Sequence, residues 1–450
     1  MPTPSDPLAL LRSRRYLGLL MLAAAIGVPV AAAAYGFLAL VTWLQDWIFT
    51  GLPGELGLAS EPIWWPVLPL LLAGLLVGLV IRQLPGNGGR SPADGFKAGE
   101  GAPVPVELPG VLLAALATLS LGVVLGPEAP LIALGGGLGV CAVRLLRRDV
   151  PAQTSAVLAA AGSFAAVSTL LGSPLLGAFL LMEASGLAGQ TLELVLLPGL
   201  LAAGIGSLIF LGLDNLTGLG TFSLAIPHLP HVGSPTLAEF GWAIAIGLIA
   251  ALLGSAIRRL GLILRPRVER RLLLAMPAAG LVIALLAIAF AAGTAKASSE
   301  VLFSGENALG PLITHSAGYT VATLLLLIAC KSLAYGVSLS AFRGGPTFPA
   351  MFVGAAGGMA LSHLAGLPLV TGVAMGIGAM CAVLLRLPMT SVLLATLLLE
   401  SDGLAVMPLV ILAVVVAYTA SARLTPPTAA VPPSPRTQPS AAPSQPSAEA

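Results

Sequence analysis

The stretch GPEAPLIALGGGLG, residues 126–139, places one carboxylate, Glu128, between two prolines at the start of an apolar, glycine-rich segment. It aligns without gaps on GPTFPAMFVGAAGG, residues 345–358, at an offset of 219 residues. A second match joins the segments around Pro174 and Pro388 at an offset of 214 residues. Two correlated matches at nearly the same offset indicate that the chain is built from two related halves.

The composition excludes a soluble globular domain. Of the 450 residues 57% are hydrophobic and only 9% are charged, and the mean hydropathy is +0.98. A helix needs ~20 mainly apolar residues to cross the hydrocarbon core, and uncharged runs of that order recur from Tyr16 to Arg423. The sequence therefore predicts an all-α polytopic membrane protein.

The apolar runs are of two kinds. Three have the length of full crossings, namely 16–44, 63–81 and 238–257. Four others are short and interrupted by glycine or proline, namely 108–125, 131–143, 174–182 and 388–399. Broken helices of this kind usually line a cavity between the repeats of a transporter.

The charges orient the chain and divide it. Lys and Arg gather before the first run and between 258 and 271, whereas 44–62 has none, so the basic segments are expected to face the cytoplasm. The first run is too long for a signal peptide and is interpreted as a retained span of a multi-pass protein of the cytoplasmic membrane. We predict a cytoplasmic N-terminus (1–15), a first transmembrane repeat (16–257), a basic connecting loop (258–271), a second repeat (272–424) and a disordered tail rich in Pro, Ser and Ala (425–450).

The repeated Gly-Pro-x-x-Pro motif has a physical meaning. Proline lacks an N–H and suits the first turn of a helix, so Pro130 and Pro349 are predicted to begin helices that point their N-termini inward. Free amides at a helix start carry a partial positive charge and bind anions. Two such ends make a site for a small anion that needs no Lys or Arg, and partial charges hold it weakly enough for release.

Glu128 is interpreted as a gate. Its ionised carboxylate is a tethered anion that can occupy the amide-lined site, and once protonated it would leave the site to the permeant anion. The alternative is a solvated glutamate that only favours the helix dipole. Membrane depth argues for function, because buried acids there are costly.

These residues resemble motifs of the CLC family of chloride channels and anion/proton antiporters. GPEAP is similar to the family's Gly-Arg-Glu-Gly-Pro, GGPTFP to its Gly-Gly-x-Phe-x-Pro, and GNG at 86–88 to the start of its Gly-Ser-Gly-Ile-Pro. AYTASARL is similar to its last-helix tyrosine motif and places Tyr418 on that tyrosine. The resemblance implies a CLC-type fold of two inverted-topology repeats with broken helices, and a homodimer with one anion pathway in each subunit.

The resemblance also implies roles for single residues. Glu128 would be the external gate and proton-transfer group, and the anion would contact Asn87, Tyr418 and the amides around Pro346, Thr347 and Phe348. The filter backbone would comprise Gly86, Gly88, Gly126, Pro127, Ala129, Pro130, Gly345 and Pro349.

Three departures from the family pattern bear on the ion. Asn87 stands where the family has its anion-coordinating serine, and Thr347 takes the place of the phenylalanine, which follows as Phe348. Ala184 falls on the internal proton-transfer glutamate, and Glu183, one residue earlier, is interpreted mainly as a structural polar contact because one helical step turns a side chain by about 100°. Family members that lack this acid include passive chloride channels and a fluoride/proton-exchanging branch.

An intramembrane hydrolase is the alternative from another class. It would need paired metal ligands or a Ser–His dyad, but His228, His231, His315 and His363 are scattered and no HExxH motif occurs. No metal, other cofactor or nucleic acid is expected, and Cys141, Cys330 and Cys381 are interpreted as packing residues. The sequence thus predicts a channel or transporter, not an enzyme, that moves chloride or a similar small anion under the control of Glu128. Coupling to protons stays open, and fluoride/proton antiport is the alternative within the family.

Overall fold

The computed structural model of the chain describes residues 12–58, 62–96, 102–146, 151–168, 170–171, 173–186, 190–218, 233–399 and 403–425. Throughout these ranges the regular structure is helical, and seven helices are long and apolar enough to cross a membrane. The prediction of an all-α, multi-pass membrane protein is confirmed. The predicted tail, apart from Thr425, and His228 and His231 lie outside the described residues.

The first half of the chain runs from α2 to α9. Its helices are α2 (Arg14–Asp46), α3 (Leu52–Glu55), α4 (Val67–Gln83), α5 (Leu108–Ser120), α6 (Glu128–Leu146), α7 (Ala152–Val167), α8 (Pro174–Ser185) and α9 (Gln190–Thr217). The second half comprises α10 (Leu237–Arg270), α11 (Leu272–Thr294), α12 (Glu306–Thr314), α13 (Val321–Ala341), α14 (Thr347–Leu361), α15 (Leu369–Leu385), α16 (Pro388–Leu397) and α17 (Gly403–Leu424).

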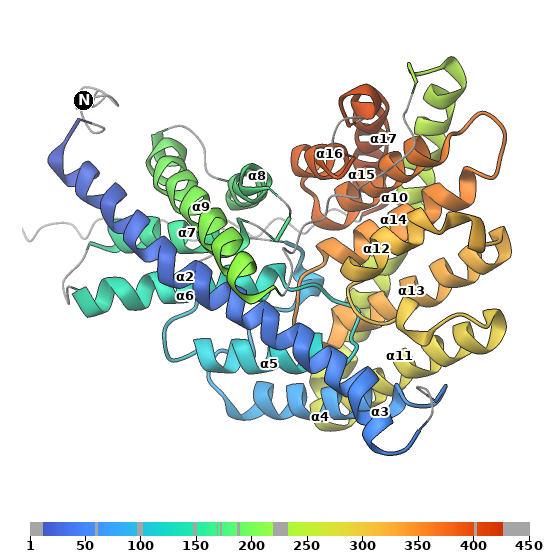
Figure 1. Cartoon of the computed structure of the whole chain (residues 1–450), viewed down its shortest axis with the longest axis horizontal. Helices are drawn as coiled ribbons and strands as arrows, with labels where there is room; N and C mark the ends of the chain where they lie inside the picture. Colours follow the sequence, from blue (N-terminus) through green and yellow to red (C-terminus); the bar gives the residue numbers. More distant parts are fainter. Residues whose placement is uncertain are drawn as a thin grey trace, which may run out of the picture.

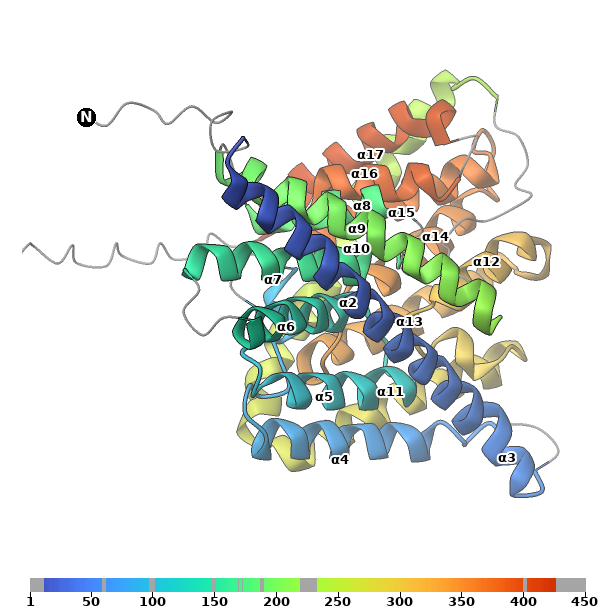
Figure 2. The same cartoon turned by 60° about the vertical axis from the view of Figure 1, so that its left-hand side comes forward.

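The two halves pack in the same way. In the first, α2 lies against α7 and α9, and α6 pairs with α7; in the second, α10 lies against α15 and α17, and α14 pairs with α15. Figure 1 shows α6 to α9 on the left and α12 to α17 on the right. The halves are tied together where α4 packs against α11, at the bottom of Figure 2.

The packing groups α10 with the second half, because α10 lies against α15 and α17 as α2 lies against α7 and α9. The segment 258–271, predicted to be a connecting loop, is not a loop, since α10 continues as a helix through Arg270. Its polar end is supported by an i,i+4 ion pair in which Arg265 Nε lies 2.7 Å from Glu269 Oε1.

Glycines set the distance between the paired helices. A Cβ added to Gly135 on α6 would lie 2.3 Å from the carbonyl oxygen of Gly162 on α7, and one added to Gly354 on α14 would lie 2.3 Å from that of Gly376 on α15. Gly135 and Gly354 are 219 residues apart, and Gly162 and Gly376 are 214 apart, which are the offsets of the two sequence matches. Part of the similarity between the two halves of the sequence therefore reflects the need for glycine where two helix backbones are in close contact.

We expect Gly354→Ala to lower the thermal stability of the purified protein, by about 1–3 kcal/mol, because the new methyl group must push α14 away from α15. Gly357→Ala is the matched control on the same helix, since a Cβ there meets nothing within 4 Å. Thermal unfolding in detergent measures both variants. Equal midpoints for Gly354→Ala and Gly357→Ala would show that the close contact does not hold the pair together.

Candidate functional site

The site forms where the two repeats meet at a pair of glycines. Gly126 precedes α6 and Gly345 precedes α14, and each donates its N–H to the other's carbonyl oxygen at 2.7 Å. This isolated antiparallel bridge joins two equivalent positions of the repeat. It places the starts of α6 and α14 side by side.

Both helix starts leave their first amides outside the helical ladder. The first ladder bond of α6 runs from Leu131 N to Pro127 O at 3.0 Å, and that of α14 from Ala350 N to Pro346 O at 3.4 Å. The helices begin at Glu128 and Thr347, two residues before the prolines predicted to start them. Pro130 and Pro349 instead occupy the third position, where a missing N–H still costs no helical bond.

Glu128 fills the space between the two glycines. Its side chain is fully buried, and its Oε1 accepts a hydrogen bond from the backbone N–H of Thr347. A Cβ on Gly345 would lie 2.0 Å from the carboxyl carbon of Glu128, and one on Gly126 would lie 2.2 Å from Oε2. The carboxylate of the first repeat therefore sits on the helix start of the second, in a space that only glycines leave open.

Two polar atoms of this site have no hydrogen-bond partner of standard geometry among the described residues. They are Oε2 of Glu128 and Oγ1 of Thr347, and both are buried. Such groups are costly in an apolar interior. The hydroxyl can donate to an anion, and the carboxylate oxygen can take a proton.

Helix α13 supports the site through residues that belong to none of the sequence motifs. The buried hydroxyl of Tyr335 donates to the carbonyl oxygen of Pro346 at 2.6 Å. One turn on, Ser338 accepts from the N–H of Val124 at 3.3 Å and donates to Ala334 O at 2.8 Å. The only feature of the sequence that marks Tyr335 and Ser338 is that two hydroxyl side chains stand three residues apart on an apolar helix. Pro346 offers no N–H, so the amides next to it that can face an anion are those of Thr347 and Phe348.

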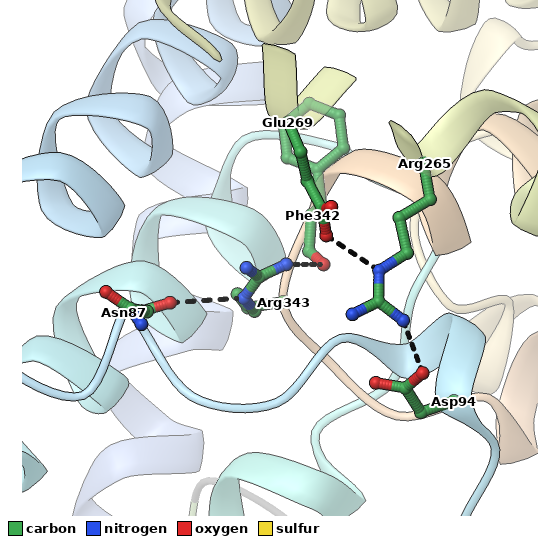
Figure 3. Close-up of polar contacts among 6 residues, drawn as sticks. All are labelled: Asn87, Asp94, Arg265, Glu269, Phe342 and Arg343. Atoms are coloured by element: carbon green, nitrogen blue, oxygen red, sulfur yellow. Dashed lines mark hydrogen bonds and ion pairs between the residues drawn. The ribbon is translucent and has the colours of Figure 1, made fainter. Parts of the chain in front are cut away.

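A cavity of about 750 Å³ is lined in part by residues at both helix starts. Its wall includes the turn Gly86–Gly89, Ala129 and Pro130 at the start of α6, and Arg343, Gly344 and Pro346 before α14. Asn87 lies in this wall with a left-handed backbone, φ +51°, and its carbonyl oxygen accepts from Arg343 Nε at 3.4 Å, as Figure 3 shows. The structure thus brings the GNG turn and the two helix starts to one cavity.

Tyr418 is not part of that wall. It lies on α17 with its side chain 37% exposed. Its contact with the anion stays a prediction.

Glu183 lies near the C-terminal end of α8 and makes a structural contact with α16. Its Oε1 accepts from Met389 N at 3.0 Å, and its Oε2 accepts from Thr390 N at 2.8 Å and from the Thr390 hydroxyl at 2.6 Å. These are the free donors at the start of α16, so Glu183 acts as the N-terminal cap of that helix. The interpretation of Glu183 as a structural polar contact agrees with this geometry.

Within the described residues, no group of three or more His, Cys, Asp and Glu side chains is arranged to hold a metal ion. The polar groups at the two helix starts are amides, the Thr347 hydroxyl and the carboxylate of Glu128.

Comparison with known proteins agrees with this geometry. Residues 74–422 match the family described as "Voltage gated chloride channel". A relative from Escherichia coli O7:K1 that bears the name "Putative ion-transport protein YfeO" is 30% identical over 365 residues, which cover 79% of this chain and 82% of the relative. The protein of the same name from Escherichia fergusonii is equally similar.

Two solved structures have the same fold. A slow cyanobacterial Cl-/H+ antiporter superposes with a TM-score of 0.71 at 19% identity, covering 90% of this chain and 94% of that one. A CLC-type fluoride/proton antiporter superposes with a TM-score of 0.67 at 21% identity, covering 90% and 95%. The resemblance seen in the motifs is confirmed, and the chain belongs to the voltage gated chloride channel family, the CLC family.

Proposed function

We propose that this protein moves chloride or a similar small anion across the cytoplasmic membrane, and that Glu128 is its gate. Family membership makes the chain a channel or transporter and not an enzyme. One observation carries the gate proposal: the Glu128 carboxylate, itself an anion, is held between Gly126 and Gly345 on the amide that begins α14.

The gate works by competition for one site. While Glu128 is ionised, its Oε1 uses the Thr347 amide that a permeant anion needs. Protonation removes the charge, which weakens the charge-assisted bond and lets a free anion take the place of the carboxylate. The partial charges of two helix starts then bind that anion without the full charge of a Lys or Arg, so that it can also leave.

Proton coupling is part of the proposal, and fluoride is the second candidate ion. The two structural neighbours are, by their titles, a Cl-/H+ and a fluoride/proton antiporter. Thr347 favours fluoride as an alternative, because its buried hydroxyl lies beside the site and fluoride is a strong hydrogen-bond acceptor. Ala184 offers no internal acid, so a proton would need another route on the side of α8.

The remaining assignments follow the family pattern. We assign anion contacts to Asn87, Tyr418 and the amides of Thr347 and Phe348, with the basic ends of the helices in the cytoplasm. The protein would act as a homodimer with one pathway in each subunit.

We expect Glu128→Gln to keep anion flux and to lose its pH dependence together with any coupled proton movement, because an amide cannot bind and release the gating proton. Purified protein in liposomes, loaded with chloride or fluoride, would be followed with an anion electrode and a pH electrode. The native protein is the reference, with flux that rises as the pH falls. A variant with the native pH dependence would contradict the assignment of Glu128 as the gate.

Glu183→Ala should lower stability by about 1–3 kcal/mol without changing the ratio of protons to anions moved, because it removes the cap of α16 but no proton donor. Glu183→Gln keeps one acceptor oxygen and should lose less. Thermal unfolding and the liposome assay measure the two properties separately. Loss of proton movement with unchanged anion flux would instead make Glu183 a proton-transfer residue.

A further inference from the structure

Arg343 lies two residues before Gly345, in the segment that links α13 to α14. Its side chain is partly buried and forms part of the cavity wall. The backbone N–H of Arg343 donates to the hydroxyl of Thr118 at 3.4 Å, which fixes the residue against α5. A guanidinium is thus built into the approach to an anion site that itself needs no formal positive charge.

The Arg343 guanidinium is bonded to carbonyl oxygens and not to acids. Its Nε donates to Asn87 O at 3.4 Å and its Nη1 to Phe342 O at 3.3 Å. No carboxylate of the described part of the chain lies within ion-pair distance of it. These two bonds use two of the five N–H donors of the guanidinium, so three stay available to another acceptor.

Neighbouring Arg265 shows the contrast. Figure 3 shows Arg265 between two carboxylates, with Nε on Glu269 at 2.7 Å and Nη1 on Asp94, while Arg343 points away toward the turn of Asn87. The two acids nearby are therefore engaged by Arg265. The charge of Arg343 stays uncompensated by a direct ion pair.

Three charged side chains of the described residues lie in the cavity wall, namely Arg90, Arg343 and Glu107. Glu107 uses Oε2 to accept the N–H of Val104 at 3.2 Å, within its own turn. A basic side chain without a carboxylate partner, placed in the wall of a recess, attracts anions into it.

We propose that Arg343 is a recruitment site at which a small inorganic anion is held in this cavity before it reaches the amides of α6 and α14. This inference rests on the proposed anion transport. Arg343 is close in sequence to the Thr347 amide but lies in the cavity wall, whereas Glu128 is not part of that wall. Partial exposure screens the charge, so the anion is held weakly and passes on.

The test is the concentration dependence of chloride flux in liposomes at constant ionic strength. Arg343→Gln should raise the apparent KM about three- to tenfold and leave the maximal rate within about twofold, since it removes one screened charge from the approach and nothing from the amide site. Arg343→Lys, which keeps the charge, should stay near the native KM. Arg267→Gln is the matched control, because Arg267 is exposed on α10 outside the cavity wall.

An unchanged KM in Arg343→Gln beside a transporting native protein would overturn the recruitment site and leave the proposed function intact. An equal shift in Arg267→Gln would also overturn it, since general surface charge would then explain the effect. Absence of anion flux in the native protein would overturn both proposals. If Arg343→Gln fails to fold, Arg343→His replaces it: its KM should be higher at pH 8 than at pH 6 by more than in the native protein, and an equal ratio would refute the inference.

Discussion

The structure depends on the pair of hydrogen bonds that Gly126 and Gly345 exchange. Each glycine ends the irregular segment before a broken helix, and each is the repeat equivalent of the other. Because the bonds are mutual, the two segments are fixed in register, and the helix starts that follow them are brought to one point. A side chain at either glycine would occupy the space that Glu128 now fills. One contact thus joins the halves and leaves room for a charge.

The Gly126–Gly345 contact also explains how a chain with few charged residues can bind an anion. Closely packed helix pairs, α6 with α7 and α14 with α15, aim their amides at the junction, and hydroxyls of α13 hold the loops in place. A partial charge suffices at the centre because the surroundings are apolar. A full positive charge, that of Arg343, lies instead in the wall of the neighbouring cavity.

Much of this site could be predicted because the signal was local. The motif repeated at 126–130 and 345–349 defines both helix starts to within two residues, and proline chemistry predicts free amides at Glu128 and Thr347. The structure shows the carboxylate of Glu128 on one of those amides. The glycine pattern also carries the helix pairing, because close contact admits no other residue at Gly135 or Gly354.

Other features depend on contacts between distant segments. The local sequence does not predict that Tyr335 donates a hydrogen bond to Pro346. Nor does it predict that Arg343 donates one to Asn87, which is 256 residues away. The charges of 258–271 predict a connecting loop, whereas its apolar residues and an internal ion pair sustain a helix through Arg270. Where Tyr418 lies relative to the anion is likewise a matter of how α17 packs.

The most direct test of Glu128 as the gate is a crystal structure of Glu128→Gln grown in bromide, with the anion located by its anomalous scattering. If Glu128 competes with the permeant anion, a bromide lies at the Thr347 amide, between Gly126 and Gly345, in the variant and not in the native protein. Competition is refuted if no bromide occupies that position in the variant, or if one lies there beside an undisplaced native carboxylate.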